Sequence, residues 1–191
     1  MIKIILASTS PRRKELLKQI GLKFTAVSSD FREDMTVKMK PINLAKKLSR
    51  GKAEAVAKKY RNHLIIAADT FIAHNNKVLG KPHTAPKAIK TLQQISGQCL
   101  SVISGITIID TNKNKTLSQA VSTKVFIKKL TPQEIKNYVA SGEPLDKAGA
   151  FGIQGLGSLL IKKISGDYSN VVGLPLTTLA EMLKKFGVKI L

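Results

Sequence analysis

The sequence predicts an α/β protein with a mixed sheet and flanking helices. Patterns typical of strands and of helices alternate along the whole chain, and no segment repeats another. The 191 residues suit one ordinary globular domain or two small lobes, because domains commonly contain roughly 100–200 residues. Apolar residues make up 43% of the chain, which is enough to form a core and excludes intrinsic disorder as the default.

The first elements are predicted to be a strand, a helix and a second strand. Ile2–Leu6 is a short apolar run of strand length. Apolar residues at helical spacing follow Pro11, which suits the first position of a helix, with Ser10 as the N-cap and Gly21 as the stop signal. Phe24–Val27 is again short and apolar, so a second strand is expected there.

A long helix and a hairpin are predicted next. Apolar residues recur at helical spacing from Pro41 to Tyr60, although Gly51 interrupts the pattern. The apolar run His63–Ala68 predicts a buried strand that ends at Asp69. Asn75-Asn76 predicts a two-residue turn from which the chain returns as another strand.

The second half of the chain continues the alternation. Residues 85–95 have helical spacing, whereas residues 100–108 and 118–127 alternate as strands do. Thr131 to Glu134 form a capping-box pattern that opens a helix reaching Ala140. The remaining expectations are a glycine-bearing loop at 148–157, a strand at 159–164 and a closing helix at 175–186.

The chain is strongly basic, with 32 Lys and Arg against 12 Asp and Glu and a net charge of +20. Such a charge favours nucleic acid, an anionic membrane surface or polyanionic nucleotides as partners. The single cysteine, Cys99, cannot form an internal disulfide, and the apolar start is too short for a signal peptide. Thr91–Ile109 is free of charge, but its glutamines and serines argue against a membrane helix. We therefore expect a cytoplasmic protein without a membrane association.

The turn between the first strand and the first helix is the strongest anion-binding candidate. Ser8, Ser10, Arg12 and Arg13 all fall on this turn. Unpaired backbone N–H groups and the positive end of the helix dipole favour an anion there. Two arginines in the first helical turn oppose that dipole unless negative charge comes from outside. The pattern favours phosphate binding over a serine cap with solvent-facing arginines.

Four further charged residues are candidates for chemistry, each with a structural alternative. Asp69 is expected at a strand end, where open α/β sheets place ligands, and a carboxylate can hold a divalent metal or accept a proton. A turn or cap role explains Asp69 equally well. For Lys52 or Lys81 taken alone, a solvated surface position is favoured over a functional role, although a glycine and a proline flank Lys81. Glu33 lies in an acid-poor region, and its role is similarly undecided between chemistry and structure.

Gln154 lies within a glycine-rich run over residues 141–155. Closely spaced glycines let a backbone approach a ligand, and a glutamine offers both a donor and an acceptor to the edge of a nucleobase. A flexible structural loop explains the glycines but not the glutamine. Dinucleotide-binding, Walker A, zinc-finger and helix-turn-helix patterns are absent from the sequence.

Taken together, these segments resemble the Maf family of nucleoside triphosphate pyrophosphatases. Arg12, Thr70 and Gln154 look like the branch that acts on dTTP and UTP rather than the sister branch that acts on methylated GTP. One departure is Gly51, where relatives often have glutamate. The segments that carry the resemblance are Leu-Ala-Ser-Thr-Ser-Pro-Arg-Arg at 6–13, Lys-Ala at 52–53, Ala-Asp-Thr at 68–70, Gly-Lys-Pro at 80–82, Ser-Gly-Gln at 96–98, residues 138–149, Gly-Ile-Gln-Gly at 152–155 and Val-Gly-Leu-Pro-Leu at 172–176.

The resemblance implies a single domain over residues 1–191, with a mixed, twisted sheet and two lobes around a central active-site cleft, similar to the inosine triphosphatase architecture and usually a homodimer. It implies hydrolysis of dTTP and UTP to the nucleoside monophosphate and pyrophosphate with Mg²⁺ or Mn²⁺. Asp69 is then the general base, and Glu33 and Asp69 are metal ligands. The other implied roles are triphosphate binding by Ser8, Arg12, Arg13, Lys52 and Lys81, and base preference by Arg12, Thr70 and Gln154.

Two alternatives stay open at this point. A basic nucleic-acid-binding protein, or a regulator of septum formation and cell division, would account for the charge and predicts duplex binding that weakens steeply with salt. The nine aromatic residues supply few platforms for stacking on single strands, so nucleic acid is not the favoured partner. Among enzymes, the alternative is hydrolysis of modified pyrimidine nucleotides instead of canonical ones.

Overall fold

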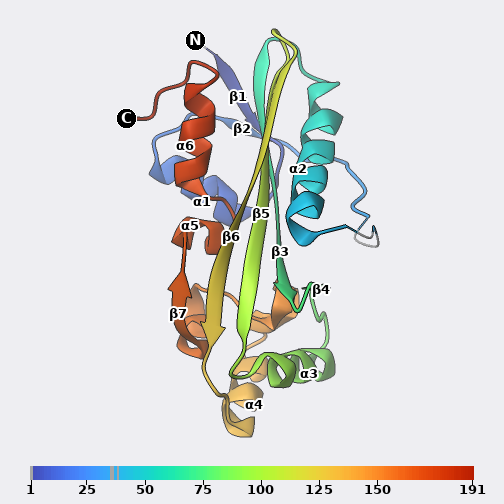
Figure 1. Cartoon of the computed structure of the whole chain (residues 1–191), viewed down its shortest axis with the longest axis vertical. Coiled ribbons are helices and arrows are strands. Elements are labelled where there is room, and N and C mark those ends of the chain that lie inside the picture. The colour runs from blue at the N-terminus through green and yellow to red at the C-terminus, as the bar shows by residue number, and fades with distance from the viewer. Residues whose placement is uncertain (1, 35–36, 38) are drawn as a thin grey trace. The chain divides into compact units, whose positions relative to one another are not determined.

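A computed structural model describes residues 2–34, 37 and 39–191 of the chain, and Figure 1 shows it as a ribbon. Within these residues the strands are β1 (Lys3–Leu6), β2 (Thr25–Ala26), β3 (His63–His74), β4 (Lys77–Leu79), β5 (Cys99–Asp110), β6 (Lys115–Ile127) and β7 (Ile161–Ser165). The helices are α1 (Pro11–Gln19), α2 (Pro41–Ala57), α3 (Ala85–Ile95), α4 (Pro132–Ala140), α5 (Tyr168–Val172) and α6 (Leu176–Lys184). Short 3₁₀ turns lie between α4 and β7, namely η1 (Glu143–Asp146), η2 (Ala148–Ala150) and η3 (Gly155–Leu160).

The strands form a mixed sheet in the order β2-β1-β3-β5-β6-β7, with β4 paired to β3. β1 pairs in parallel with both β2 and β3. β4 pairs antiparallel with β3, and β7 pairs antiparallel with β6. Helices lie alongside the strands, as Figure 1 shows. The predicted class, an α/β fold with a mixed sheet and flanking helices, is confirmed. Of the described helices, none has the length and apolar character needed to cross a membrane.

The chain divides into two compact units. Unit 1 comprises Met1–Thr70, Ser104–Val121 and Gly173–Leu191, and unit 2 comprises Phe71–Ile103 and Ser122–Val172. β3, β5 and β6 each contribute residues to both units. The expectation of one domain with two lobes and a central cleft stays a prediction.

In unit 1, α2 packs closely on the sheet. Its buried face follows the helical period and includes Leu44, Ala45, Leu48, Ser49, Lys52, Ala53 and Val56. Gly105 of β5 makes the close approach possible, because a Cβ there would lie 1.9 Å from the carbonyl oxygen of Ala45. The Ser49 hydroxyl also lies 2.9 Å from the Thr107 hydroxyl of β5, so a polar contact sets the register of the helix on the strand.

The alternation of side chains along β3 explains which of them face α2 in unit 1. Side chains alternate between the two faces of a strand. Ile65 and Ala67 of β3 share a core cluster with Ala53 and Val56 of α2. Asp69 is the next member of the same alternating row, so its carboxylate is directed toward the helix.

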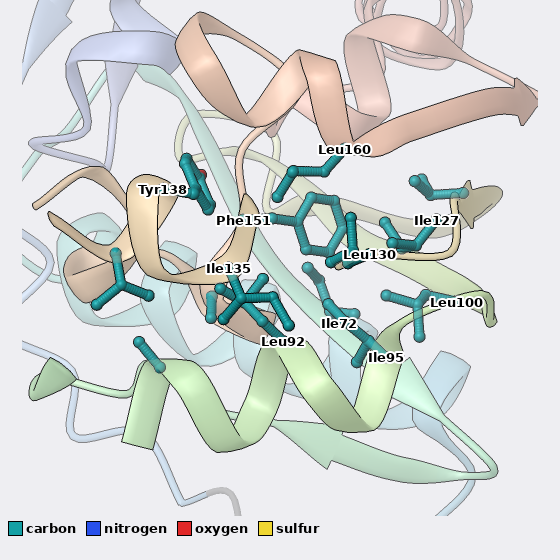
Figure 2. Packing of buried hydrophobic residues seen from close by; sticks show 14 of the residues in the cluster. Ile72, Leu92, Ile95, Leu100, Ile127, Leu130, Ile135, Tyr138, Phe151 and Leu160 are labelled. Atoms are coloured by element: carbon teal, nitrogen blue, oxygen red, sulfur yellow. The ribbon is translucent and has the colours of Figure 1, made fainter. Parts of the chain in front are cut away.

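Unit 2 has its own apolar core, which Figure 2 shows from close by. Side chains of β3, α3, β5, β6 and α4 pack there with the 3₁₀ turns. Fully or almost fully buried members include Ala88, Leu92, Ile95, Leu100, Val125 and Ala150. Phe151, which follows η2, and Leu160, which ends η3, are in the same cluster, so the glycine-bearing segment is attached to the core.

Two local predictions are confirmed in detail. Asn75 and Asn76 both have positive φ, +49° and +61°, and join β3 to β4 as a tight hairpin. At the start of α4, the Thr131 hydroxyl accepts a bond from the Glu134 backbone N–H, and the Glu134 carboxylate accepts one from the Thr131 N–H. Each signal is contained within four residues, so distant contacts do not alter it.

The prediction that the strand after residue 63 ends at Asp69 is wrong. β3 continues to His74, and Asp69 lies in its interior. Thr70, Phe71 and Ile72 are β-formers that continue the alternation, and β4 pairs with the far end of the strand. A charged side chain does not end the strand, because a partner on α2 compensates it.

Other boundaries differ from the prediction by small amounts. β6 begins at Lys115 instead of residue 118, α2 ends at Ala57 and α6 spans Leu176–Lys184. The segment 148–157 is not an open loop, since η2 and the start of η3 lie within it, and β7 begins only at Ile161. α5 was not predicted, because this helix of five residues is too short to show a hydrophobic period.

Gly51 does not break α2, which runs continuously through it. A Cβ at this position would lie 2.3 Å from the ring of Phe31. The glycine therefore makes room for Phe31 on the helix surface, and Phe31 lies two residues before Glu33. The departure from glutamate has a packing reason.

Candidate active site

The candidate site of unit 1 begins at the turn between β1 and α1. β1 pairs in parallel with β3 so that Leu6 lies opposite Ile66. The turn that follows β1 is therefore brought beside the part of β3 that carries Asp69 and Thr70. Ser8 in this turn is buried, with 9% of its surface exposed.

Ser10 occupies the N-cap position of α1, as predicted, but its side chain makes no capping bond. Its backbone N–H instead donates to the Ser8 hydroxyl at 3.3 Å. Proline at the first helical position removes one N–H and leaves the others of the first turn directed out of the helix. Arg12, in that turn, is exposed. This turn keeps the properties that favour an anion.

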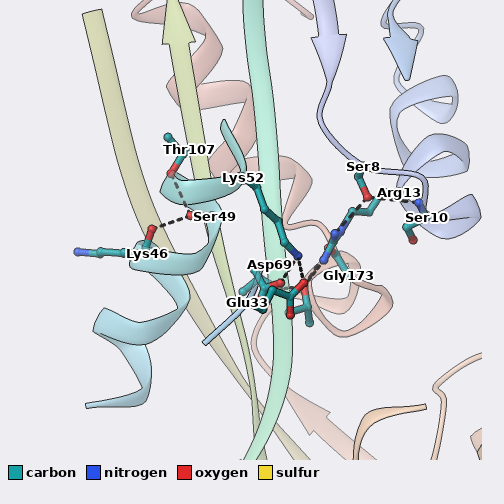
Figure 3. A network of polar contacts seen from close by, with 12 residues as sticks. Ser8, Ser10, Arg13, Glu33, Lys46, Ser49, Lys52, Asp69, Thr107 and Gly173 are labelled. Carbon is teal, nitrogen blue, oxygen red and sulfur yellow. Dashed lines mark hydrogen bonds and ion pairs between the residues drawn. The ribbon is translucent and has the colours of Figure 1, made fainter. Parts of the chain in front are cut away.

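Arg13 joins three parts of unit 1, as Figure 3 shows. Its Nε donates to the carbonyl oxygen of Gly173 at 2.9 Å, and its two terminal nitrogens donate to the hydroxyls of Ser8 and Thr70, both at 3.2 Å. Burial lowers the pKa of the Arg13 guanidinium, while the charge of Asp69 opposes that effect. Arginine nevertheless stays protonated in proteins, so a fixed positive charge lies at this point.

Neighbouring groups use the full hydrogen-bonding capacity of the Thr70 hydroxyl. Its hydroxyl donates to the carbonyl oxygen of Gly173 at 3.1 Å, accepts from Arg13 and lies 2.7 Å from the Ser104 hydroxyl. Since a hydroxyl has one proton, Ser104 must be the donor in the last contact. A direct bond from this hydroxyl to a base would require one of these bonds to break, and the predicted role of Thr70 in base preference stays a prediction.

Lys52 lies between two carboxylates. Its Nζ is 2.5 Å from Asp69 Oδ1 and 2.7 Å from Glu33 Oε1. The side chains of Lys52 and Asp69 are 11% and 8% exposed, whereas that of Glu33 is 43% exposed. The structure thus brings together three residues that are far apart in the sequence. The side chains of Lys52 and Asp69 are largely buried in this group, whereas that of Glu33 is accessible to solvent.

The position of Lys52 follows from the helical period of α2. Leu48 and Val56, four residues before and after it, are both buried with 1% exposure. A lysine on this face would be costly without a partner, because a buried charge requires compensation. Asp69 supplies that compensation from the row of β3 that faces the helix.

Glu33 and Asp69 are suited to a divalent cation that arrives with a phosphate. Both carboxylates contact one ammonium, so they are close enough to serve a single cation. Mg²⁺ is commonly bound by one or two carboxylates plus substrate phosphates and water. Among the described residues, no group of three or more His, Cys, Asp or Glu forms a complete protein cage. The donor set therefore fits a metal shared with a substrate, and metal binding stays a prediction.

Lys81 and Gln154 belong to unit 2, and their predicted roles are not tested by the contacts of unit 1. Both side chains are exposed. The Gly80 carbonyl beside Lys81 accepts a bond from the Gly149 N–H at 3.1 Å, so the Lys81 loop is attached to η2. Gln154 is the residue immediately before η3.

Three residues that bond to predicted site residues, or to the segment next to one, were not predicted. Ser104 is a small polar residue inside the apolar run of β5, which is a usable signal. Gly173 acts through its backbone carbonyl, so no side-chain pattern could have revealed it. Glu143 lies in a segment that was singled out, but its partners in η3 are 13 and 14 residues away.

Comparisons with known proteins show the family of the chain. A family model described as Maf-like protein matches residues 3–186. The chain belongs to the Maf-like protein family. A dTTP/UTP pyrophosphatase of Methanosarcina barkeri is 48% identical over 191 residues, which cover 100% of this chain and 97% of that protein. A dTTP/UTP pyrophosphatase of Dictyoglomus turgidum is 43% identical over 189 residues, which cover 98% of each chain.

A solved structure with a similar fold is that of the Staphylococcus aureus Ham1 protein. Its TM-score is 0.50 at 15% identity, over 83% of this chain and 79% of that one. At this identity the likeness concerns the fold alone. The resemblance to the Maf family drawn from the motifs is confirmed.

Proposed function

We propose that this Maf-like protein hydrolyses dTTP and UTP between the α and β phosphates, giving the nucleoside monophosphate and pyrophosphate. The observation that carries the proposal is the Lys52–Asp69–Glu33 group beside the anion-binding turn of unit 1. Full-length relatives named dTTP/UTP pyrophosphatase support the choice of reaction.

Cationic groups of unit 1 bind the triphosphate. Lys52 has three N–H donors and uses two on the carboxylates, so one remains for a phosphate oxygen. Arg13 uses three of its five N–H groups within the protein and has two left. Ser8, Ser10 and Arg12 complete the turn. Fixed positive charge near the leaving pyrophosphate stabilises the charge that develops on it, which is the dominant catalytic effect in phosphoryl transfer.

Asp69 is the general base that accepts the proton of the attacking water. A divalent cation, Mg²⁺ or Mn²⁺, held by Glu33 and Asp69 supplies a more acidic water and offsets phosphate charge when it is bound. Lys52 orients Asp69 through a direct bond. Proton transfer to a positioned carboxylate contributes roughly 10²–10⁴-fold to a rate.

The base preference is assigned to Arg12, Thr70 and Gln154, and Lys81 is assigned to the triphosphate. Lys81 and Gln154 are exposed, so their side chains are accessible to a ligand. Glutamine can donate to one carbonyl and accept from one ring N–H, which is the pattern on a uracil or thymine edge. A modified pyrimidine that keeps this edge would bind equally well.

We expect a cytoplasmic homodimer without membrane association. The alternative of a nucleic-acid-binding or septum-related protein is favoured only by the net charge of +20.

A substrate panel tests the proposal. Pyrophosphate release is measured for dTTP, UTP, CTP, dATP, GTP and modified pyrimidine triphosphates, with Mg²⁺, with Mn²⁺ and with a chelator. We expect dTTP and UTP to be preferred and the chelator to abolish release. Failure to hydrolyse any pyrimidine triphosphate would contradict the proposal, and salt-sensitive duplex binding in its place would favour the alternative.

A further inference from the structure

The carboxylate of Glu143 is bound at the start of η3. Its Oε2 accepts a bond from the Leu156 N–H at 2.9 Å, and its Oε1 accepts one from the Gly157 N–H at 3.0 Å. These are backbone groups of the first turn of η3, directly after Gln154. Glu143 therefore anchors the chain on the C-terminal side of Gln154.

Tyr138 connects the same carboxylate to the N-terminal side of Gln154. Its hydroxyl donates to Glu143 Oε1 at 3.0 Å and also has a hydrogen bond with the backbone of Gly152. The ring of Tyr138 is buried in the core of unit 2 (Figure 2). Burial, and after it the bond to Glu143, raises the pKa of the Tyr138 hydroxyl, so this group remains a donor.

The glycines of this segment permit the close packing around the carboxylate. A Cβ on Gly155 would lie 2.7 Å from Glu143 Oε2, and Gly155 has a φ of +67°. A Cβ on Gly157 would lie 2.3 Å from the Gly152 carbonyl oxygen and 2.6 Å from the Tyr138 hydroxyl. Side chains at these positions would displace the anchors, so the glycines here serve packing and not flexibility.

A surface ion pair does not explain the position of the Glu143 carboxylate. The chain has only 12 acidic residues, and the bonds described above to the Glu143 carboxylate come from neutral donors. Lys147 reaches the backbone carbonyl of Glu143, at 3.4 Å, and forms its ion pair with Asp146. A carboxylate used in this way holds a backbone conformation, and between its two anchors lie the exposed residues Gln154 and Gly155, of which Gln154 carries a polar side chain.

We infer that Glu143 is a positioning residue that fixes the backbone on both sides of Gln154 and thereby determines how selectively the enzyme takes uracil and thymine nucleotides. The inference rests on the proposed function, because it assigns base reading to Gln154. Glu143 itself need not touch the substrate. A side chain that reads a base edge must be held in place, since small displacements of a bonding group cost large factors in rate.

The test compares Glu143→Gln with a matched control elsewhere in unit 2. The two backbone N–H groups bind different oxygens of Glu143, and in E143Q one of these oxygens is replaced by an NH₂ group, which donates and cannot accept an N–H bond. Glu134→Gln is the control, because Glu134 is also a carboxylate of unit 2 that accepts a backbone N–H, but its bonds are to Thr131 at the start of α4 and to Lys128. The readouts are amide hydrogen exchange at residues 156 and 157, thermal stability, and kcat and KM for UTP and GTP.

For E143Q we expect exchange at residues 156 and 157 to accelerate and the UTP-to-GTP ratio of kcat/KM to fall by about tenfold, with most of the change in KM for UTP. E134Q is expected to lose stability without changing the exchange at 156 and 157 or the ratio. In a Gln154→Ala background, E143Q is expected to change the ratio no further, because the residue through which Glu143 acts is gone.

Specific results would overturn the inference. A ratio within about twofold of wild type in E143Q, or an equal further drop in the Q154A background, rules out action through Gln154. If E143Q does not fold, Tyr138→Phe replaces it, since this change removes the hydroxyl that contacts Glu143 and Gly152 and keeps the ring. An unchanged UTP-to-GTP ratio in Y138F would also rule out action through Gln154.

The inference and the proposed function can fail separately. If the wild type hydrolyses no pyrimidine triphosphate, the proposed function fails. Unchanged exchange at residues 156 and 157 in E143Q would refute the anchoring role of Glu143 whatever the activity.

Discussion

Replacing Lys52 by methionine isolates the energetics of the buried ion pair. The methionine side chain has a similar length and removes the charge, which leaves the 8%-exposed carboxylate of Asp69 without its ammonium partner. Removing one partner of a buried pair costs about 3–5 kcal/mol. Glu33 is 43% exposed and is hydrated at little cost, and the attraction of Arg13 remains, so the lower end of this range applies.

Methionine keeps most of the packing of the lysine stem, so the loss reports the unpaired carboxylate of Asp69. We therefore expect K52M to lose about 3 kcal/mol of unfolding free energy relative to wild type at pH 7.

Urea unfolding at pH 7 measures this difference. Lys47→Met is the matched control, because Lys47 is an exposed lysine of the same helix, and its stability should stay within about 0.5 kcal/mol of wild type. Adding Asp69→Asn to K52M removes the unpaired charge and should recover part of the loss. A loss below about 1 kcal/mol at pH 7 would refute the assignment of a buried, compensating pair.

Three further predictions follow from other parts of the chain. Asp69→Asn should lower kcat by roughly 10²–10⁴-fold in a pyrophosphate-release assay with little change in KM, and wild-type activity would remove Asp69 from the mechanism. Gly105→Ala should destabilise the fold by about 1–3 kcal/mol or more, because its Cβ would lie 1.9 Å from the Ala45 carbonyl and α2 must move; wild-type stability in urea would contradict this packing. The bond from Lys128, followed by the capping bonds of α4, lowers the pKa of Glu134 from 4.5 to about 2. The charged form therefore stabilises the fold above about pH 4.5, and this contribution is lost as the pH falls toward 2, so the stability difference between wild type and Glu134→Gln should shrink over that range in acid unfolding.

Signals that lie within a few residues were sufficient to predict local structure. The capping box at Thr131 and Glu134 and the turn at Asn75 and Asn76 are present as expected. Proline and serine at the start of α1 also predicted the helix start, although not that the Ser10 side chain would be free of a capping role. These features depend on bonds between neighbours along the chain, which is why a single sequence reveals them.

The candidate site was predicted less completely, because its geometry comes from distant segments. Lys52 and Asp69 are 17 residues apart, and Arg13 and Gly173 are 160 residues apart. No spacing rule connects such residues, and from composition alone Lys52 could not be distinguished from the surface lysines. The motif order could identify these residues as a set, but not which atoms meet.

What the sequence determined by itself was the α/β class, the order of most elements, the family and the set of candidate residues, since periodicity, turn chemistry and motifs are written along the chain. The tertiary structure decided that Asp69 lies inside β3, facing α2, and that Lys52 is buried against it. It also decided that Gly51 accommodates Phe31. The physical reason is that side-chain direction and burial depend on which elements pack together, and the parallel pairing of β1 with β3 and the close approach of α2 to β5 bring these residues into one site.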